Sequence, residues 1–283
     1  MHAYKKMINN LIKEYINNGF DRETARSEID FVCSIVFNLT SVDLMLGKNY
    51  PENFEEELKN IIFKRLKTKR PIQQITQKAY FMNKTYIVDE NVLIPRQETE
   101  LLVLKAKEII EKNNFKTFLD IGTGTGCIAV SLLELLPDLT GTGVDISEPA
   151  LKISNQNSQE HKVSERLKLK KSNLFSNITE KFDLIISNPP YIPRKDKPSL
   201  QSEVRDFEPE LALFTEDNDG IDVYKKIISQ SDKYLNQGGY LMFEIGYNQG
   251  KLLENLFKTS PFSDFELIKD LDQNDRIVLA QLK

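Results

Sequence analysis

The feature of this sequence that most constrains its fold is an alternation of strand-like and helix-like segments that begins after Pro95. The predicted strands are short apolar runs, and the predicted helices carry apolar residues at helical spacing. The strands are expected at residues 117–121, 141–146, 167–170, 182–187, 240–245, 265–271 and 276–282, and the helices at residues 100–111, 128–136, 149–159, 223–235 and 250–257. This alternation predicts an α/β domain with a mostly parallel sheet and helices on both faces. Only residues 272–275 separate the last two strands, which predicts a hairpin and therefore a terminal antiparallel strand in the sheet.

Two further segments precede this sheet. Residues 1–75 carry apolar residues at helical spacing, which predicts a small α-helical bundle. Residues 76–95 place β-branched and aromatic residues on either side of Asn83, a pattern typical of a β-hairpin, here one that links two domains. Residues 96–283 then form the sheet domain. A basic cluster at residues 64–70 is interpreted as a solvated helix end, because the first 80 residues hold 13 basic and 10 acidic side chains, a small excess.

Composition excludes several classes of protein. The 38 basic and 42 acidic side chains give a net charge of −4, which is too small for attraction to nucleic acid to dominate. With two cysteines and two histidines, the chain lacks the residues for a disulfide framework, a Cys/His zinc site or a Ser-His-Asp hydrolase, and no metal is expected. No apolar segment has the pattern of a signal peptide or the length of a transmembrane helix, so a cytoplasmic protein is expected.

The first predicted strand leads into a loop with three alternating glycines, Gly122-Thr123-Gly124-Thr125-Gly126. Glycines allow a tight turn and let a ligand lie against bare main chain. The loop also stands at the carboxyl end of a strand, where open α/β sheets bind ligands. We therefore expect it to bind a cofactor. The candidate cofactor contacts are Asp120, Gly122, Thr123, Gly124, Thr125, Gly126 and Asp145.

Two cofactors fit the glycine pattern. Gly124, Gly126 and Ala129 satisfy the G-x-G-x-x-A pattern of dinucleotide-binding proteins, and Asp145 follows at a suitable distance. A carboxylate at Asp120, directly before the loop, would repel a pyrophosphate but attract the amino group of S-adenosylmethionine. Asp145 could accept both ribose hydroxyls in either case. These residues favour S-adenosylmethionine, with a nicotinamide dinucleotide as the alternative.

The predicted strand 182–187 ends in Asn188-Pro189-Pro190-Tyr191. The two prolines end the strand ladder and leave carbonyls free to accept hydrogen bonds. Asn188 adds a side-chain carbonyl acceptor, and the Tyr191 ring offers a face on which a planar group can stack. The motif therefore predicts a cradle for a planar NH₂ group, such as an amide or the exocyclic amine of a base. Acceptors that hold both N–H bonds would direct the nitrogen lone pair at a methyl group, so these four residues are the candidate catalytic and substrate-binding residues.

Together these motifs resemble those of the class I S-adenosylmethionine-dependent methyltransferases that act on amino nitrogens. The chain is most similar to the peptide chain release factor glutamine methyltransferases, and the resemblance covers nearly its whole length. Beyond the two motifs above, it rests on residues 93–100, Glu208-Pro209, residues 211–213, residues 244–246, Gln249-Gly250 and Asp275-Arg276.

The resemblance implies a Rossmann-like class I methyltransferase fold for residues 96–283. It also implies an enzyme that methylates the side-chain amide nitrogen of the glutamine in the Gly-Gly-Gln motif of release factors. S-adenosyl-L-methionine would be the methyl donor and S-adenosyl-L-homocysteine the product. Residues 122–126, Asp145, Asn173, Leu174 and Asn188 would contact the cofactor, and residues 188–191 would hold the glutamine.

The resemblance also implies that the helical segment 1–75 helps to dock the release factor. A monomer without stable nucleic-acid binding is expected. Two positions depart from the family pattern. Asn173 stands where Asp is frequent, which puts its adenine contact in doubt, and Gln97 stands where proline is usual.

Two alternative functions remain open on the sequence. Adenine amino-methyltransferases of DNA or RNA share the Asn-Pro-Pro-Tyr motif, because an adenine amine and a glutamine amide present similar planar NH₂ groups. Such an enzyme would need basic surface to hold phosphates, whereas residues 81–283 contain 25 basic and 32 acidic side chains. A non-catalytic binding protein on the same fold would be marked by degenerate motifs, and the motifs here are intact.

Overall fold

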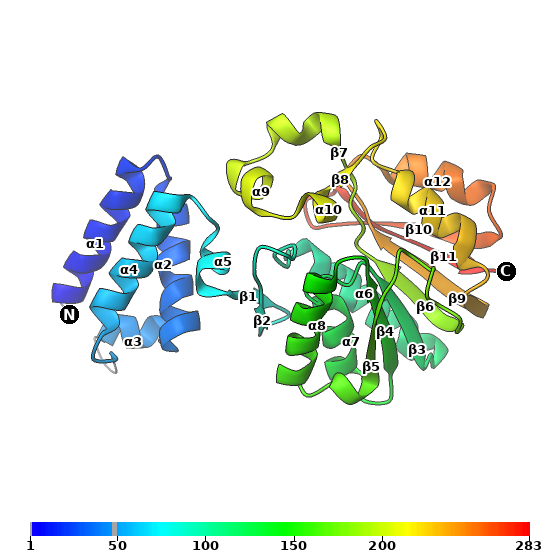
Figure 1. Ribbon diagram of the computed structural model, residues 1–283, viewed down its shortest axis with the longest axis horizontal. Coiled ribbons are helices and arrows are strands. Elements are labelled where there is room, and N and C mark those ends of the chain that lie inside the picture. Colours follow the sequence, from blue (N-terminus) through cyan, green and yellow to red (C-terminus); the bar gives the residue numbers. More distant parts are fainter. Residues whose placement is uncertain (1, 47–49) are drawn as a thin grey trace. The chain divides into compact units, whose positions relative to one another are not determined.

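The computed structural model describes residues 2–46 and 50–283 (Figure 1). The chain divides into two compact units, Met1–Lys78 and Ala79–Lys283. Each unit has its own apolar core. No helix in the described ranges is both long enough and apolar enough to cross a membrane.

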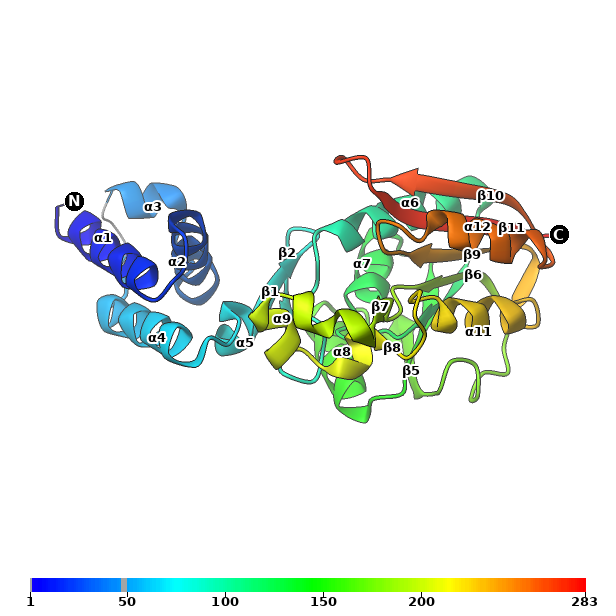
Figure 2. The same cartoon turned by 90° about the horizontal axis from the view of Figure 1, so that it is seen from above.

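The first unit is helical, as predicted. Its elements are α1 (His2–Asn17), α2 (Arg22–Phe37), α3 (Ser41–Leu46), α4 (Phe54–Thr68) and α5 (Ile72–Thr76). Helices α1, α2 and α4 pack together and bury their apolar stripes against one another (Figure 2). The Asp21 carboxylate accepts a hydrogen bond from the Thr24 N–H and so caps the start of α2.

Arg65 in α4 is an exception to the interpretation of residues 64–70 as a solvated helix end, whereas Lys64 and Lys67 are exposed as expected. Its side chain is fully buried, and its guanidinium contacts the Glu28 carboxylate at 2.8 Å. The Tyr15 hydroxyl donates to the same carboxylate at 2.7 Å. A charge can be buried only with such partners, because desolvation would otherwise cost several kcal/mol, in order of magnitude. Periodicity does not reveal this pairing, since Glu28 and Arg65 lie on different helices.

The second unit is built on a seven-stranded sheet with the order β10-β11-β9-β6-β3-β4-β5. The strands are β3 (Thr117–Ile121), β4 (Thr140–Asp145), β5 (Leu167–Lys171), β6 (Phe182–Ser187), β9 (Leu235–Glu244), β10 (Phe262–Lys269) and β11 (Asp275–Leu282). The pairs from β5 to β9 are parallel, whereas β11 is antiparallel to both of its neighbours. The predicted parallel sheet with one antiparallel strand is confirmed.

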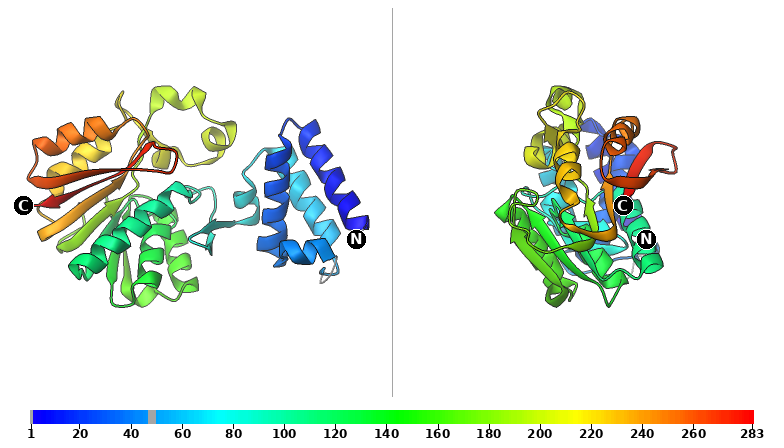
Figure 3. Two further views of the ribbon diagram at one scale, coloured as in Figure 1. Left: turned by 180° about the vertical axis from the view of Figure 1, so that it is seen from behind. Right: turned by 90° about the vertical axis from the view of Figure 1, so that its right-hand side faces the viewer.

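Helices cover both faces of this sheet, also as predicted (Figure 3). On one face lie α6 (Glu98–Asn113) and α7 (Cys127–Leu135), with α8 (Glu148–Glu160) beside α7. On the other lie α11 (Asp222–Ser231) and α12 (Gly250–Lys258). Because side chains alternate along a strand, Phe118 of β3 packs in the first layer and Leu119 in the second. A short 3₁₀ turn, η1 (Ser164–Arg166), leads into β5.

Two parts of the second unit differ from the sequence-based expectation. The helix expected at 223–235 ends at Ser231, and Leu235 already pairs with Phe182 in the sheet. Between β6 and α11 the chain makes an excursion that the alternation did not predict. It contains β7 (Ile192–Pro193), η2 (Arg194–Ser199), α9 (Ser202–Phe207), α10 (Glu210–Leu213) and β8 (Phe214–Thr215), with β7 and β8 paired in parallel.

The predicted β-hairpin is formed by β1 (Lys78–Phe81) and β2 (Lys84–Ile87). Met82 and Asn83 between them both have left-handed backbone angles, φ 51° and 59°, as a two-residue type I′ turn requires. From Ala79 onward the hairpin packs on the second unit. The Tyr86 hydroxyl lies 2.8 Å from Ser131 Oγ in α7, and Asn157 of α8 bonds both the N–H and the carbonyl of Ile87.

Candidate active site

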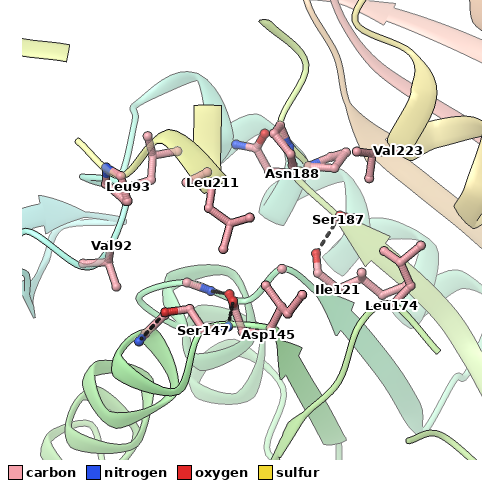
Figure 4. Close-up of a pocket in the computed structure, with 18 of the residues that line it drawn as sticks. Val92, Leu93, Ile121, Asp145, Ser147, Leu174, Ser187, Asn188, Leu211 and Val223 are labelled. Atoms are coloured by element: carbon pink, nitrogen blue, oxygen red, sulfur yellow. Dashed lines mark hydrogen bonds between the residues drawn. The ribbon is translucent and has the colours of Figure 1, made fainter. Parts of the chain in front are cut away.

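The second unit has a cavity at the carboxyl ends of β3, β4 and β6 (Figure 4). Its volume of about 230 Å³ far exceeds the water-sized voids left between packed side chains. The glycine loop, the end of β4 and the Asn-Pro-Pro-Tyr segment all reach it. Of the residues singled out in the sequence, the cavity is lined by Gly122, Gly124, Asp145, Asn173, Leu174, Asn188, Pro189 and Pro190.

The glycine loop presents bare main chain to the cavity. The N–H groups of Gly122 and Thr123 both donate to the Val144 carbonyl, which fastens the loop to β4. Gly122 and Gly124 have φ of 72° and 55°, and a Cβ added at Gly122 would meet no protein atom within 4 Å. The open side of these residues therefore faces the cavity, and any side chain there would be strained as well as intrusive.

Asp145 lies at the end of β4, on the wall of the cavity. One carboxylate oxygen accepts from the Gly124 N–H at 3.0 Å and the other from the Ser147 N–H at 2.9 Å. An ionised carboxylate has about four acceptor positions, so each oxygen keeps capacity for another donor. Burial raises the pKa of this group, and its backbone hydrogen bonds oppose that rise.

Asn173 and Leu174 follow β5 and line the same wall. Leu174 has a left-handed backbone with φ 51°, which is uncommon for a residue with a branched side chain. The Ser172 hydroxyl holds this conformation by donating to the Leu174 carbonyl at 2.7 Å. Strain of this kind persists only where neighbouring contacts impose it, and it concentrates at functional sites.

Four of the candidate cofactor residues lie behind the loop and do not line the cavity. Asp120 is fully buried, and its carboxylate accepts a hydrogen bond from the Thr123 hydroxyl at 2.6 Å. The carboxylate therefore supports the loop from beneath. Thr125 accepts at its Oγ from the Cys127 N–H, and Gly126 packs so tightly that a Cβ there would lie 2.5 Å from Ser154 Oγ. The sequence places all of them in one motif but does not separate the lining residues from the supporting ones.

The Asn-Pro-Pro-Tyr motif stands at the end of β6, opposite the glycine loop. The Ser187 hydroxyl donates to the Ile121 carbonyl at 2.6 Å and so ties the two strand ends together (Figure 4). Tyr191 is half-buried and does not line the cavity. Burial raises the pKa of its hydroxyl to about 12, so Tyr191 stays neutral near pH 7 and is not a proton acceptor there.

Two buried residues that the motifs did not single out as site residues hold the Asn188 side chain. The amide nitrogen of Asn188 donates to Thr99 Oγ1 at 3.2 Å, and the Thr99 hydroxyl donates to Glu244 Oε2 at 2.6 Å. Thr99 is the second residue of α6, and Glu244 is the last residue of β9. Glu244 carries a signal that could have been used: it is an acidic residue at the carboxyl end of an apolar strand, as Asp145 is.

Gln249 fixes the backbone around Tyr191. Its side-chain N–H groups contact the carbonyls of Tyr191, Asp219 and Gly220 at 3.1, 3.0 and 3.1 Å, and its carbonyl accepts from the Gly246 N–H. The side chain is buried, so these bonds satisfy main-chain groups that water does not reach.

The remaining walls of the cavity come from segments in which the sequence analysis assigned no site residues. The segment after the hairpin contributes Asn91, Val92 and Leu93, and the excursion after β6 contributes Pro209, Leu211 and Ala212 (Figure 4). An ion pair of 2.5 Å between Arg96 and Glu208 joins these two segments. The cavity is thus closed on this side by two loops that one salt bridge holds together.

Cys127 does not have the properties of a nucleophile. It is buried at the start of α7, and burial raises the pKa of its thiol to about 12. It is a packed residue of the first helical turn, as interpreted from the sequence.

The sheet order, the single antiparallel strand and the glycine loop at the carboxyl end of the first sheet strand define a class I methyltransferase fold. The catalytic domain of hMettl16, solved in complex with MAT2A 3'UTR hairpin 6, shares it with a TM-score of 0.58 over 83% of this chain and 84% of that one, at 14% identity. A model of the methyltransferase small domain matches residues 97–204.

Curated relatives define the family more narrowly. The release factor glutamine methyltransferase of Streptococcus pneumoniae is 37% identical over 281 residues, which are 97% of each chain. That of Clostridium acetobutylicum is 35% identical over 97% of this chain and 98% of the relative. The chain therefore belongs to the release factor glutamine methyltransferase family, and the resemblance stated from its motifs is confirmed. This membership makes it an enzyme and sets aside the non-catalytic alternative.

Proposed function

We propose that this protein transfers a methyl group from S-adenosylmethionine to the side-chain amide nitrogen of the glutamine in the Gly-Gly-Gln motif of a peptide chain release factor. The observation that carries the proposal is the placement of the Asn-Pro-Pro motif across one cavity from the glycine loop. Family membership supports the same reaction.

The lining of the cavity fits S-adenosylmethionine. Gly122 and Gly124 leave room for a ligand against the main chain, and the Asp145 carboxylate keeps acceptor capacity for ribose hydroxyls. Ile146, Leu174 and Val223 supply apolar surface, as a purine ring requires. The polar groups of Asn173 stand beside Leu174, where they could meet the edge of the base. When bound, this cofactor supplies an electrophilic methyl group on a positively charged sulfur.

Asn188 and the two prolines would hold the acceptor amide. An amide nitrogen is a poor nucleophile because its lone pair is delocalised into the carbonyl group. The Asn188 side-chain carbonyl and the main-chain carbonyls of this motif would accept the two N–H bonds, which orients the lone pair and stabilises the positive charge that develops on nitrogen. The Tyr191 ring does not line the cavity, so it would support the motif from behind. The cradle thus contributes positioning and electrostatic stabilisation, and no side chain with the pKa of a general base is required.

Asp120 would act on the cofactor through the loop. Its carboxylate accepts a hydrogen bond from Thr123 beneath Gly122 and Gly124, and Asp120 does not line the cavity. We therefore propose that Asp120, Thr123, Thr125 and Gly126 hold the loop in the shape that binds the cofactor.

The helical unit 1–75 would help to dock the release factor, as the family resemblance implies. Residues 76–95 would connect it to the catalytic domain of residues 96–283. A release factor works at the ribosome, so the enzyme would meet it in the cytoplasm, and we propose that it acts as a monomer. The nucleic-acid alternative has no specific observation in its favour, since the hMettl16 likeness at 14% identity shows the fold alone.

Transfer of labelled methyl groups tests the proposal directly. The purified protein would be offered labelled S-adenosylmethionine with the release factor of the same organism, with that factor carrying alanine for the Gly-Gly-Gln glutamine, and with unmethylated DNA or RNA. Label on the intact factor and none on the alanine form is the expected result. Label on nucleic acid alone would overturn the proposal and identify adenine as the acceptor.

A further inference from the structure

We propose that Thr99 and Glu244 are positioning residues that lock the Asn188 side-chain amide in one orientation, with its carbonyl oxygen toward the acceptor nitrogen. The proposal deepens the function proposed above and rests on it. It begins from a relay of three polar side chains: Thr99 of α6, Asn188 directly after β6, and Glu244 of β9.

While Glu244 is ionised, the direction of the hydrogen bonds in this relay is fixed from one end. An ionised carboxylate can only accept hydrogen bonds. The Thr99 hydroxyl, which has a single proton, must therefore donate it in the hydrogen bond to Glu244 Oε2, 2.6 Å away. The Thr99 oxygen then has only lone pairs to offer to Asn188. The NH₂ group of Asn188 donates a hydrogen bond to this oxygen at 3.2 Å.

The other end of the Asn188 amide is therefore its carbonyl oxygen. In the part of the chain that the structure describes, no residue donates a hydrogen bond to this oxygen, and Asn188 lines the cavity. An oxygen in this position accepts an N–H of the substrate. If the amide were rotated by half a turn, two N–H donors would face the two N–H donors of the substrate.

This orientation matters for which atom is methylated. A glutamine amide has two ends, and its carbonyl oxygen is the more electron-rich one. A site that presents acceptors binds the NH₂ end, whereas a site that presents donors binds the carbonyl end or a carboxylate. The relay from Glu244 thus selects the nitrogen of glutamine and disfavours glutamate at the same position.

The surroundings of the relay keep it rigid and dry. Thr99 and Glu244 are 3% and 2% exposed. The Tyr224 hydroxyl of α11 donates to the main-chain carbonyl of Glu244 at 2.9 Å, and β9 is paired with β11 at this residue. A relay whose two inner residues are held on a helix and a strand loses little orientation to thermal motion.

The ionisation of Glu244 sets the direction of the relay. Burial raises the pKa of this carboxyl to about 7, the hydrogen bond from Thr99 and the charge of Arg276 oppose the rise, and the charge of Glu98 adds to it. The other titratable groups that sense Glu244 are Tyr191, Tyr224 and Cys127, and burial raises the pKa of each of them, so they stay neutral near pH 7. Protonated Glu244 can donate to Thr99 and so permit the reversed relay.

The test compares Thr99→Val with Thr99→Ser in the full-length protein. Valine keeps the shape of threonine and removes the hydroxyl, whereas serine keeps the hydroxyl. With saturating S-adenosylmethionine and release factor, Thr99→Val is expected to lower kcat roughly 10- to 100-fold, the effect of one misdirected buried hydrogen bond. Thr99→Ser should stay within about threefold of the wild type. The dissociation constant of S-adenosylmethionine should be the same for all three proteins.

Ser131→Ala is the matched control. It also removes a buried hydroxyl that has a partner, Tyr86, but on α7, outside the relay. It should lower the melting temperature with kcat unchanged. Equal losses of kcat in Thr99→Val and Ser131→Ala would show a general effect of stability, and full activity of Thr99→Val would show that the relay is dispensable. Either result overturns the inference.

A double-mutant cycle with Glu244→Gln tests whether the two residues act through one another. If Glu244 acts through Thr99, Glu244→Gln should lower kcat in the wild-type background and change it by less than about twofold in the Thr99→Val background. The fall of wild-type kcat below pH 7 should also disappear in Glu244→Gln. Independent effects and an unchanged pH profile would overturn the inference. A wild-type protein that does not label the release factor would instead overturn the proposed function.

Discussion

The Asp145 carboxylate accepts a hydrogen bond from the main-chain N–H of Gly124 at 3.0 Å, so the end of β4 is tied to the loop that follows β3. The bond makes one carboxylate serve two purposes. It shapes the glycine loop, and it presents its remaining acceptor positions to the cavity.

Replacement of Asp145 by alanine should weaken the binding of S-adenosylmethionine roughly 10- to 100-fold, because the hydrogen bonds of a charged acceptor are lost. Isothermal titration of the cofactor measures this directly. Glu148→Ala is the control, since it removes an exposed carboxylate close by that pairs with Lys171. Unchanged affinity in Asp145→Ala would contradict the assignment of the ribose contact.

Asn188→Ala should abolish most methyl transfer and leave the cofactor largely unaffected. The loss expected in kcat is on the order of 100-fold or more, the usual effect of removing a group that stabilises developing charge. Transfer to the release factor and titration of S-adenosylmethionine are measured on the same preparation. A folded variant that no longer binds the cofactor would mean that the main role of Asn188 is misplaced.

Gly220→Ala should disrupt the backbone behind the Asn-Pro-Pro-Tyr motif. Gly220 has φ 72°, and a Cβ there would lie 2.0 Å from the Tyr191 carbonyl oxygen and 2.6 Å from Gln249 Nε2. We expect a loss of roughly 3 kcal/mol in the free energy of unfolding and a reduced kcat. Gly238→Ala is the matched control: its φ is 76°, but the nearest atom would be 3.6 Å away, so only the cost of the backbone angle, about 1 kcal/mol, should remain. Denaturant unfolding of both variants measures the two losses in free energy of unfolding. Equal losses in Gly220→Ala and Gly238→Ala would refute the steric argument.

The pH dependence of the free energy of unfolding should reveal the titration of the Asp120 carboxyl. Burial raises the pKa of its carboxyl from 3.8 to about 7, the Thr123 hydrogen bond opposes the rise, and the charge of Asp145 adds to it. Between these two values the folded protein holds a proton that the unfolded chain releases, so the free energy of unfolding falls as the pH rises through this window.

Asp120→Asn removes this titration. The melting temperature of the variant relative to the wild type should therefore increase from about pH 4 to pH 7 and level off above, since the wild type alone is penalised by the ionised group. Melting curves of the two proteins without cofactor provide the measurement. A difference that does not vary with pH would show that Asp120 titrates normally.

The local parts of the site could be predicted from the sequence. Three alternating glycines after a strand are typical of a ligand-binding loop, and Asn-Pro-Pro-Tyr must end a strand because its prolines cannot continue the ladder. Since both motifs follow parallel strands, their meeting at one edge of the sheet follows from the fold class. The sheet, its antiparallel strand and the hairpin were predicted for the same reason.

The parts of the site that depend on distant pairs could not be predicted. Thr99 and Glu244 are bonded across 145 positions of the chain, and Arg96 and Glu208 across 112. Neither pair forms a periodic pattern. The burial of Arg65 could not be predicted for the same reason, because its partner Glu28 lies on another helix. The loops that close the cavity lack regular patterns altogether, so residues such as Val92 and Leu211 could be assigned to it only from the fold.

The position of β11 has a consequence for how the molecule is made. Residues 275–282 are synthesised after every other strand of the sheet, yet they insert between β9 and β10, with Ile277 opposite Glu244. The main-chain N–H of Ile245 is likewise bonded to the Arg276 carbonyl at 2.9 Å. A nascent chain that has already produced the glycine loop and the Asn-Pro-Pro-Tyr motif therefore still lacks the strand that anchors Glu244. A chain without residues 275–282 would therefore hold both motifs but lack the strand that pairs with β9 at Glu244.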